Sequence, residues 1–362
     1  MLVGYRAGQS WLRQLTFEHI PQNILPKLLN LLNGRPLPLL KSFALTLEQG
    51  EPFRADSFLF GAPLLTTPQF FGRIEPKSAF ESLTSLRLTH IAIADHRAYN
   101  SFRDGLMNIK SLQHLELQLK EFEFLSSPDP LPILLPTIQF LHVASADYCH
   151  EFINWFVASI RAPLLTTLSL NGWSEEEDEP GEAHFPLLRH LLLVNVIEGL
   201  PDLLPLAEKF PDIERLTCQL STNNNHSPNQ FSINDLFTHI VNAGREHKEN
   251  RLPCPWPKLH TIATSACLVP SRTSVQHKKH KAVERLHASI MALQDNGQPI
   301  RKLLLPKSFF VKVGAEAEMG LRKVVEVEVY YDDWPMPFTG DRCAGVHSHS
   351  CFAEFYSSMA QI

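Results

Sequence analysis

The sequence lacks the signatures of several large classes of protein. Its six cysteines are scattered and form no Cys-x-x-Cys pair, so we expect reduced thiols in a cytoplasmic or nuclear protein rather than a disulfide framework. The N-terminus has no charged region followed by a long apolar run, and no signal peptide is expected. No stretch approaches about 18 uninterrupted apolar residues, so no membrane span is expected either.

The motifs of the common catalytic classes are also missing. The chain has no Gly-x-Ser-x-Gly elbow, no phosphate-binding P-loop and no Gly-x-Gly-x-x-Gly. The formal net charge is only −5, which is too small to predict nucleic acid or a membrane surface as a partner. We therefore expect a protein that is not an enzyme and holds no cofactor.

What the sequence does have is a repeated phrase, Pro-Leu-Leu-x-x-apolar-x-apolar. It occurs at 38–45, 163–170 and 186–193. Several of the 27 prolines fall at the same position of this phrase, which is typical of regular punctuation and not of disorder. Self-similarity at a steady period indicates a repeat architecture.

The repeat fits the template Leu-x-x-Leu-x-Leu, with other apolar residues allowed at the fixed positions. Matches begin at residues 40, 65, 83, 112, 138, 165, 188, 213, 259 and 300. Most successive starts lie within the range of about 20–29 residues that leucine-rich repeats show. The apolar-x-apolar step has the period of a strand. The sequence thus predicts an α/β fold, an irregular, horseshoe-like leucine-rich-repeat solenoid with parallel strands on one face and helices or turns on the other.

Three segments between matches have helical apolar spacing, namely 149–161, 231–243 and 282–293. An ordinary α/β core is the alternative for these stripes. Alternation of Val325, Val327 and Val329 with glutamates predicts a last, half-exposed strand. The match at Leu65 contains Pro68, which makes a regular strand there doubtful. We expect a helical cap or partial first repeat over 1–35, the solenoid over 36–334 and a C-terminal tail over 335–362.

Residues between the core positions of each strand should face solvent and form the partner-binding surface. Leu192 would add apolar area there, and Arg87 or Glu116 would set charge selectivity. The predicted contact residues are Arg87, His114, Glu116, His142, Ser169, Leu192 and Thr217.

A cluster of potential metal ligands lies near the C-terminus: Cys343, His347, His349 and Cys351. Cysteine and histidine are suitable zinc donors, but ligands this close together on one short segment cannot easily surround one ion. A polar tail without metal is the favoured interpretation. A metal-dependent enzyme using this cluster is the least favoured function.

Three phrases resemble those of fungal F-box/leucine-rich-repeat proteins, which carry irregular repeats of the form (Phe/Ala)-Pro-x-Leu-x-x-Leu-x-Leu. They lie at 161–170, 184–191 and 209–216, and the resemblance covers roughly 36–330. It implies an intracellular repeat domain that acts as the substrate-recognition part of an F-box-type ubiquitin-ligase receptor.

An F-box module itself is not evident. Only about 35 residues precede the first repeat, whereas the family carries a helical module of some forty to fifty residues there. The chain is then a fragment, an incomplete gene model or a relative without the module. A ubiquitin-ligase adaptor is expected as a partner only where an F-box lies upstream. The alternative is a stand-alone repeat scaffold unrelated to ubiquitin.

Overall fold

The computed structural model describes residues 12–21, 23–32, 37–47, 62–71, 82–122, 131–145, 151–171, 185–194, 203–219, 232–249, 254–265, 276–313, 315–331, 334–335 and 338. By its internal contacts the chain forms two compact units. Unit 1 contains Met1–Leu165 together with Pro335–Thr339, and unit 2 contains Thr166–Trp334 with Gly340–Ile362. The short stretch Pro335–Thr339 therefore groups with unit 1 although it follows unit 2 in the sequence.

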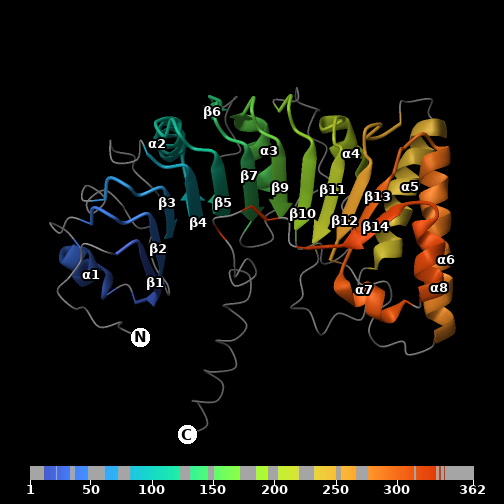
Figure 1. The fold of residues 1–362 in the computed structure, drawn as a ribbon. Helices are drawn as coiled ribbons and strands as arrows, with labels where there is room; N and C mark the ends of the chain where they lie inside the picture. The colour runs from blue at the N-terminus through green and yellow to red at the C-terminus, as the bar shows by residue number, and fades with distance from the viewer. Residues whose placement is uncertain are drawn as a thin grey trace, which may run out of the picture. The chain divides into compact units, whose positions relative to one another are not determined.

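Unit 1 is built on six parallel strands in the order β1-β2-β3-β4-β5-β7 (Figure 1). A separate two-stranded pair joins β6 to β8. The elements are β1 (Gln14–Ile20), α1 (Leu25–Leu32), β2 (Ser42–Leu47), β3 (Thr67–Phe71), β4 (Ser85–Ile93), α2 (His96–Met107), β5 (His114–Phe122), β6 (Ile133–Leu134), β7 (Phe140–Ser145), α3 (Glu151–Ser159) and β8 (Ile160–Arg161).

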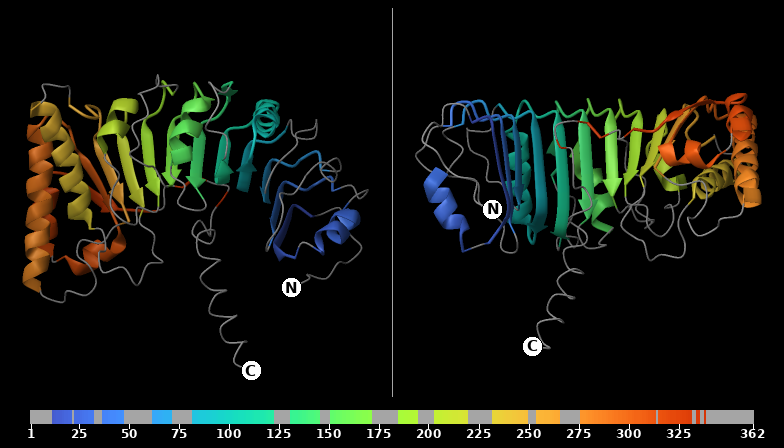
Figure 2. Two further views of the ribbon diagram at one scale, coloured as in Figure 1. Left: turned by 180° about the vertical axis from the view of Figure 1, so that it is seen from behind. Right: turned by 60° about the horizontal axis from the view of Figure 1, so that its bottom comes forward.

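Unit 2 repeats the arrangement with six parallel strands in the order β9 to β14. Helix α5 packs along α6, and α6 contacts α8, beside the last strands of this unit (Figure 2). The elements are β9 (Thr167–Asn171), β10 (His190–Val194), α4 (Leu203–Lys209), β11 (Arg215–Gln219), α5 (Ile233–Glu249), β12 (Thr261–Thr264), α6 (Gln276–Asp295), β13 (Lys302–Leu305), α7 (Lys307–Lys312), α8 (Ala315–Arg322) and β14 (Glu326–Val329).

The strand register confirms the leucine template. In unit 1, Leu86 lies beside Leu115, and Leu115 beside Leu141. The corresponding row in unit 2 runs through Leu168, Leu191, Leu216, Ile262, Leu303 and Val327. All of these side chains are buried, so each repeat covers the apolar row of its neighbour, as a stack of repeats requires.

The proline of the repeated phrase sits in a turn that leads into each strand. The amide of Leu165 donates to the carbonyl of Ala162 at 3.1 Å, and Leu188 donates in the same way to Phe185. These are bonds between the first and fourth residues of a β-turn, with proline second, where its fixed φ is suited to the turn. The first and fourth residues are buried and the two between them are exposed. The phrase is therefore a turn signal followed by a strand.

A second recurring contact aligns each strand with the preceding one. In unit 2 the amides of Arg189 and His190 both donate to the carbonyl of Thr166, and those of Glu214 and Arg215 both donate to Arg189. The same double donation recurs in unit 1, at the start of β5 for example. Because backbone groups make these bonds, the register tolerates the irregular side chains at these positions.

The three helices predicted from spacing are confirmed as α3, α5 and α6, and the last strand is confirmed as β14. Helix α2 was missed because its apolar residues follow directly on a strand. It begins at an N-cap, Asp95, whose carboxylate accepts from the amide of Ala98 at 2.6 Å. Inside it, the Tyr99 hydroxyl donates to the carbonyl of Leu131 at 2.9 Å, which ties the helix to the segment before β6.

The doubt about a strand at Pro68 is wrong, because β3 spans this residue. Pro68 removes one donor from the ladder, but its side chain is buried and Phe70 beside it packs against Phe43 at 5.7 Å between ring centroids. Burial of the apolar side chains outweighs the lost bond. Within 1–35, the described residues form β1 and α1, and β1 adds a strand before the first template match.

One bulky residue takes a left-handed backbone conformation. Trp256 has φ 48°, which is unfavourable for a side chain of this size. Its ring is buried, and its indole Nε1 donates to the carbonyl of Phe210 at 3.0 Å. These two contacts hold the turn that leads into β12. Among the helices described, none is long and apolar enough to cross a membrane.

Candidate functional site

The strand face opposite the apolar core carries different side chains in the two units. We call the positions that alternate with the two template residues of each strand the central row. In unit 1 the central row begins at Ala44 and is polar from there on, through Gln69, Arg87, Glu116 and His142. In unit 2 it runs through Ser169, Leu192, Thr217, Ala263, Leu304 and Glu328. In unit 1 the charged residues therefore lie in the middle of this face, on β4 and β5. In unit 2 they lie on the last two strands, where Lys302 is 2.8 Å from Glu328 and 3.5 Å from Glu326.

An ion pair joins β4 to β5 at the middle of the unit 1 face. Arg87 Nε donates to Glu116 Oε2 at 2.5 Å, and the second carboxylate oxygen accepts from His114 Nε2 at 2.7 Å. Arg87 also reaches Gln69 Oε1 on β3 at 3.4 Å. The Glu116 side chain is only 4% exposed and that of Arg87 13%. Both oxygens of a buried carboxylate are thus satisfied, as its burial requires.

These contacts keep Glu116 ionised. Burial alone would raise the pKa of Glu116, but the hydrogen bond from His114 and the positive charge of Arg87 hold the pKa below its ordinary value of 4.5. An ionised carboxylate can only accept hydrogen bonds. His114 Nε2 therefore carries the proton in this pair.

An aromatic residue from the C-terminal part of the chain lies on this cluster. The ring of Phe338 stacks over the Arg87 guanidinium, with the central carbon 4.6 Å from the ring centroid. Arg87 Nη2 also donates to the carbonyl of Phe338 at 3.3 Å. His114 approaches the same ring edge-on at 5.4 Å between ring centroids, and the His114 ring also contacts the ring of Phe140 at 4.4 Å. Phe338 itself is 6% exposed, so this side chain is buried on the strand face.

Sequence reasoning correctly placed Arg87, His114, Glu116 and His142 on one strand face, and the structure brings the first three into direct contact. It missed Phe338, which was assigned to a tail. The available signal was the recurrence of aromatic residues at Tyr330, Trp334 and Phe338, in a stretch where prolines disfavour a helix. The predicted exposure of His114 and Glu116 is wrong, because these side chains are buried, at 5% and 3% exposed. The role of Arg87 and His142 as partner contacts stays a prediction.

The predicted exposure of the unit 2 residues is wrong. Ser169, Leu192 and Thr217 each have 0% of their surface exposed. The chain after β14 turns back over the strand face (Figure 1), and the Tyr330 hydroxyl accepts from Gln219 Nε2 on β11 at 2.7 Å. Since a strand period gives the side of the sheet but not what covers it, sequence reasoning could not detect this cover. These three residues do not offer contact area in this conformation.

A neutral histidine lies at the edge of this covered face. His190 Nε2 and the Thr217 hydroxyl are 2.9 Å apart and share a hydrogen bond between β10 and β11. Burial lowers the pKa of His190 from 6.5 to about 3, with a smaller contribution from the charge of Arg215. The imidazole is therefore uncharged at neutral pH and acts here as a hydrogen-bonding member of the sheet.

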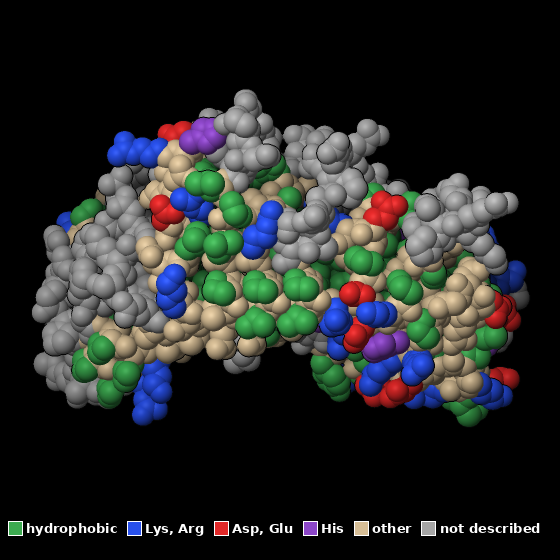
Figure 3. All heavy atoms as spheres, turned by 90° about the horizontal axis from the view of Figure 1, so that it is seen from above, with side chains coloured by type: hydrophobic (Ala, Val, Ile, Leu, Met, Phe, Trp, Pro, Cys, Tyr) green, Lys and Arg blue, Asp and Glu red, His purple; other side chains and the backbone are tan. Residues whose placement is uncertain are grey.

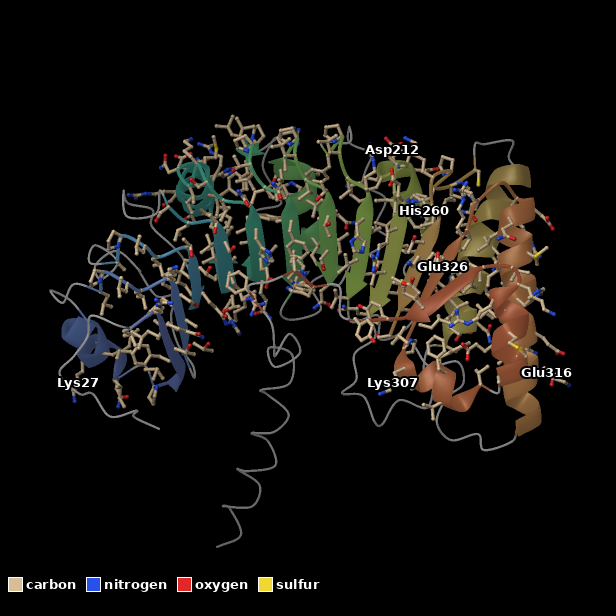
Figure 4. The ribbon with its side chains drawn as sticks, in the orientation of Figure 1. Lys27, Asp212, His260, Lys307, Glu316 and Glu326 are labelled. Atoms are coloured by element: carbon tan, nitrogen blue, oxygen red, sulfur yellow. The ribbon has the colours of Figure 1, made fainter. Side chains whose placement is uncertain are left out.

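Charged side chains of both signs gather where the strands of unit 2 begin (Figures 3 and 4). Asp212 accepts from Lys258 at 2.7 Å, and this bond lowers the pKa of Asp212. Arg189 lies 3.2 Å from Glu214, which in turn lies 3.8 Å from His260. Exposed pairs of this kind each contribute little to stability. These pairs join residues of successive repeats. Because the edge carries both signs of charge, it offers no surface of a single charge to a binding partner.

The candidate metal ligands Cys343, His347, His349 and Cys351 lie outside the described residues. Within the described part of the chain, no group of three or more histidine, cysteine or carboxylate side chains could hold a metal ion. Burial raises the pKa of the Cys218 thiol to about 12, so that this cysteine stays a protonated core residue.

Comparisons with known proteins give a likeness of fold. No family model and no curated protein matches the sequence. Among solved structures, the leucine-rich repeat-containing protein LegL7 from Legionella pneumophila is similar, with a TM-score of 0.43 and 14% sequence identity. The match covers 85% of this chain and 97% of that one. The strand order and the apolar rows of the structure itself carry the assignment as a leucine-rich-repeat-like α/β fold with parallel strands.

Proposed function

We propose that this protein is a non-enzymatic protein-binding module and that the strand face of unit 1 makes the contact. One observation carries the proposal, namely that this face already holds a side chain and a backbone carbonyl of an irregular segment, those of Phe338. A face that holds an extended piece of its own chain in this way has the chemistry to hold a piece of another protein. Parallel strands supply a rigid base for such a surface.

The composition of the face supports the same function. Arginine and aromatic residues are enriched at the points where protein interfaces have most of their binding energy. The Arg87 side chain is fixed by Glu116 and Gln69 on neighbouring strands, so little of its conformational freedom remains to be lost on binding. Glu116 has a structural role here because it is too deeply buried to contact a partner directly.

A photo-crosslinking amino acid placed at Gln118 tests the proposal. Gln118 is half-buried on β5, two residues beyond Glu116 on the same face. Lys110, exposed after α2, is the matched control position in the same unit. We expect covalent adducts with one or a few other proteins from position 118, identified by mass spectrometry, and their absence from position 110. Identical adducts from both positions, or none from 118, would contradict a binding role of this face.

The finer form of the proposal is that the module recognises substrates for an F-box-type ubiquitin ligase in the cytoplasm or nucleus. The resemblance of the repeat phrases at 161–170, 184–191 and 209–216 supports it. Affinity purification of the tagged chain separates this function from a stand-alone scaffold. Recovery of a ubiquitin-ligase adaptor and cullin, with this chain or with a longer transcript that adds an upstream module, supports the receptor. Consistent absence of both, alongside other partners, supports the scaffold.

A further inference from the structure

The chain following β14 supplies its own occupant for the face that we assign to partner binding. Of the aromatic residues Tyr330, Trp334 and Phe338 in this segment, the last two are separated by Pro335 and Pro337. Prolines restrict a segment to extended conformations and lower the entropy lost when it docks. The stretch around Phe338 thus has the composition of a short peptide ligand and not of a strand or helix.

The contacts of Phe338 are those of a docked anchor residue. Its ring lies on Arg87 and against His114, and its carbonyl accepts from Arg87. Arginine over an aromatic face is a favourable contact, especially when water is excluded. The guanidinium is already oriented by Glu116, so the subsite is preformed on β4 and β5 and does not depend on the C-terminal segment for its shape.

We infer that the strand face of unit 1 carries a subsite for one aromatic side chain and its backbone carbonyl, and that Phe338 fills this subsite in competition with an aromatic residue of a protein partner. The partner segment is extended and flanked by prolines or small residues, like the sequence around Phe338. Competition with a partner rests on the proposed protein-binding function, whereas the subsite for Phe338 can be tested without any partner.

The probe is a fluorescent peptide of residues 331–342, which contains Phe338, and its binding is measured by anisotropy against the full chain. In the wild-type chain the tethered Phe338 is present at an effective concentration on the order of millimolar and should exclude the peptide. The full-length Phe338→Ala variant leaves the subsite open. We expect this variant to bind the peptide at least about tenfold more tightly than the wild type, and a peptide carrying the same alanine to lose that gain.

Tyr331→Ala is the matched control, because Tyr331 belongs to the same segment but is 78% exposed. The Tyr331→Ala chain should exclude the peptide to the same extent as the wild-type chain. Hydrogen exchange locates the binding: with peptide bound to Phe338→Ala, amides of 85–93 and 114–122 should exchange more slowly. Equal binding to wild type and Phe338→Ala, or no binding to either, would overturn the inference. Loss of the folded state in Phe338→Ala would also overturn it, since Phe338 would then be a core residue and not a displaceable one.

Partner crosslinking from position 118 separates this inference from the proposed function. In the Phe338→Ala background we expect several-fold more adduct than in the wild-type background. Peptide exchange without any partner adduct would leave the subsite standing and remove the partner-binding function. Partner adducts that do not change with Phe338→Ala, together with absent peptide binding, would support the partner-binding function and overturn the subsite.

Discussion

The buried pair of Arg87 and Glu116 gives the sharpest prediction about stability. Replacing Glu116 by leucine removes the negative charge and leaves an arginine side chain that is only 13% exposed without its main partner. Breaking a buried pair from one side costs about 3–5 kcal/mol. Gln69 and the Phe338 carbonyl still accept from Arg87, so we expect a value near the lower end of that range.

Removing both charges should restore most of this loss. In the double variant Arg87→Met/Glu116→Leu no charge is buried, and apolar side chains of similar volume replace the pair. His114 then loses its acceptor, which leaves a loss of about 1 kcal/mol. The control is Lys258→Ala, which breaks an ion pair with Asp212 in which both side chains are about half exposed and should cost less than about 1 kcal/mol.

Urea unfolding of the full chain measures these differences, and hydrogen exchange of β4 and β5 assigns them to this cluster. The pKa of Glu116 is lowered in the folded protein, so its contribution is fully present above the ordinary value of 4.5 and is lost as pH falls below it. This pH dependence should be absent from the double variant. A loss below about 1 kcal/mol for Glu116→Leu, or an equal loss in the double variant, would refute the reasoning.

Three further outcomes follow from the core, the turns and the buried histidine. Leu191→Ala should lower the free energy of unfolding by about 2–5 kcal/mol, since this leucine is fully buried; an unchanged thermal midpoint would show that the repeat register is wrong. Trp256→Phe should lower it by about 1–3 kcal/mol, because the carbonyl of Phe210 loses its buried donor, and thermal unfolding measures the change. His190 has a pKa of about 3 when folded against 6.5 ordinarily, so its stabilising contribution is complete above pH 6.5 and falls as pH drops. Between pH 7 and pH 5 that loss amounts to about 2 kcal/mol; His190→Gln should remove this part of the pH dependence, and an unchanged urea-unfolding profile would argue against a buried neutral histidine.

The repeat was readable from sequence because its period has a local cause. Each proline-leucine phrase forms a turn within four residues, and each apolar pair alternates as a strand must. The phrase also places the exposed leucines, such as Leu187, in the third position of the turn. Helices α3, α5 and α6 were readable for the same reason, since their apolar spacing lies within one segment. The charged residues of the central row in unit 1 could be placed on one face by strand period alone.

The state of that face was decided by contacts between residues far apart in the chain. Phe338 reaches Arg87 across 251 positions, and Tyr330 reaches Gln219 across 111. Periodicity gives the side of a sheet on which Leu192 or Thr217 lies, but a covering segment without periodicity leaves no pattern to read. The sequence by itself therefore determined the repeat, its turns and the composition of the strand face. Only the tertiary structure decided which parts of that face are covered, because burial depends on long-range packing that no local signal specifies.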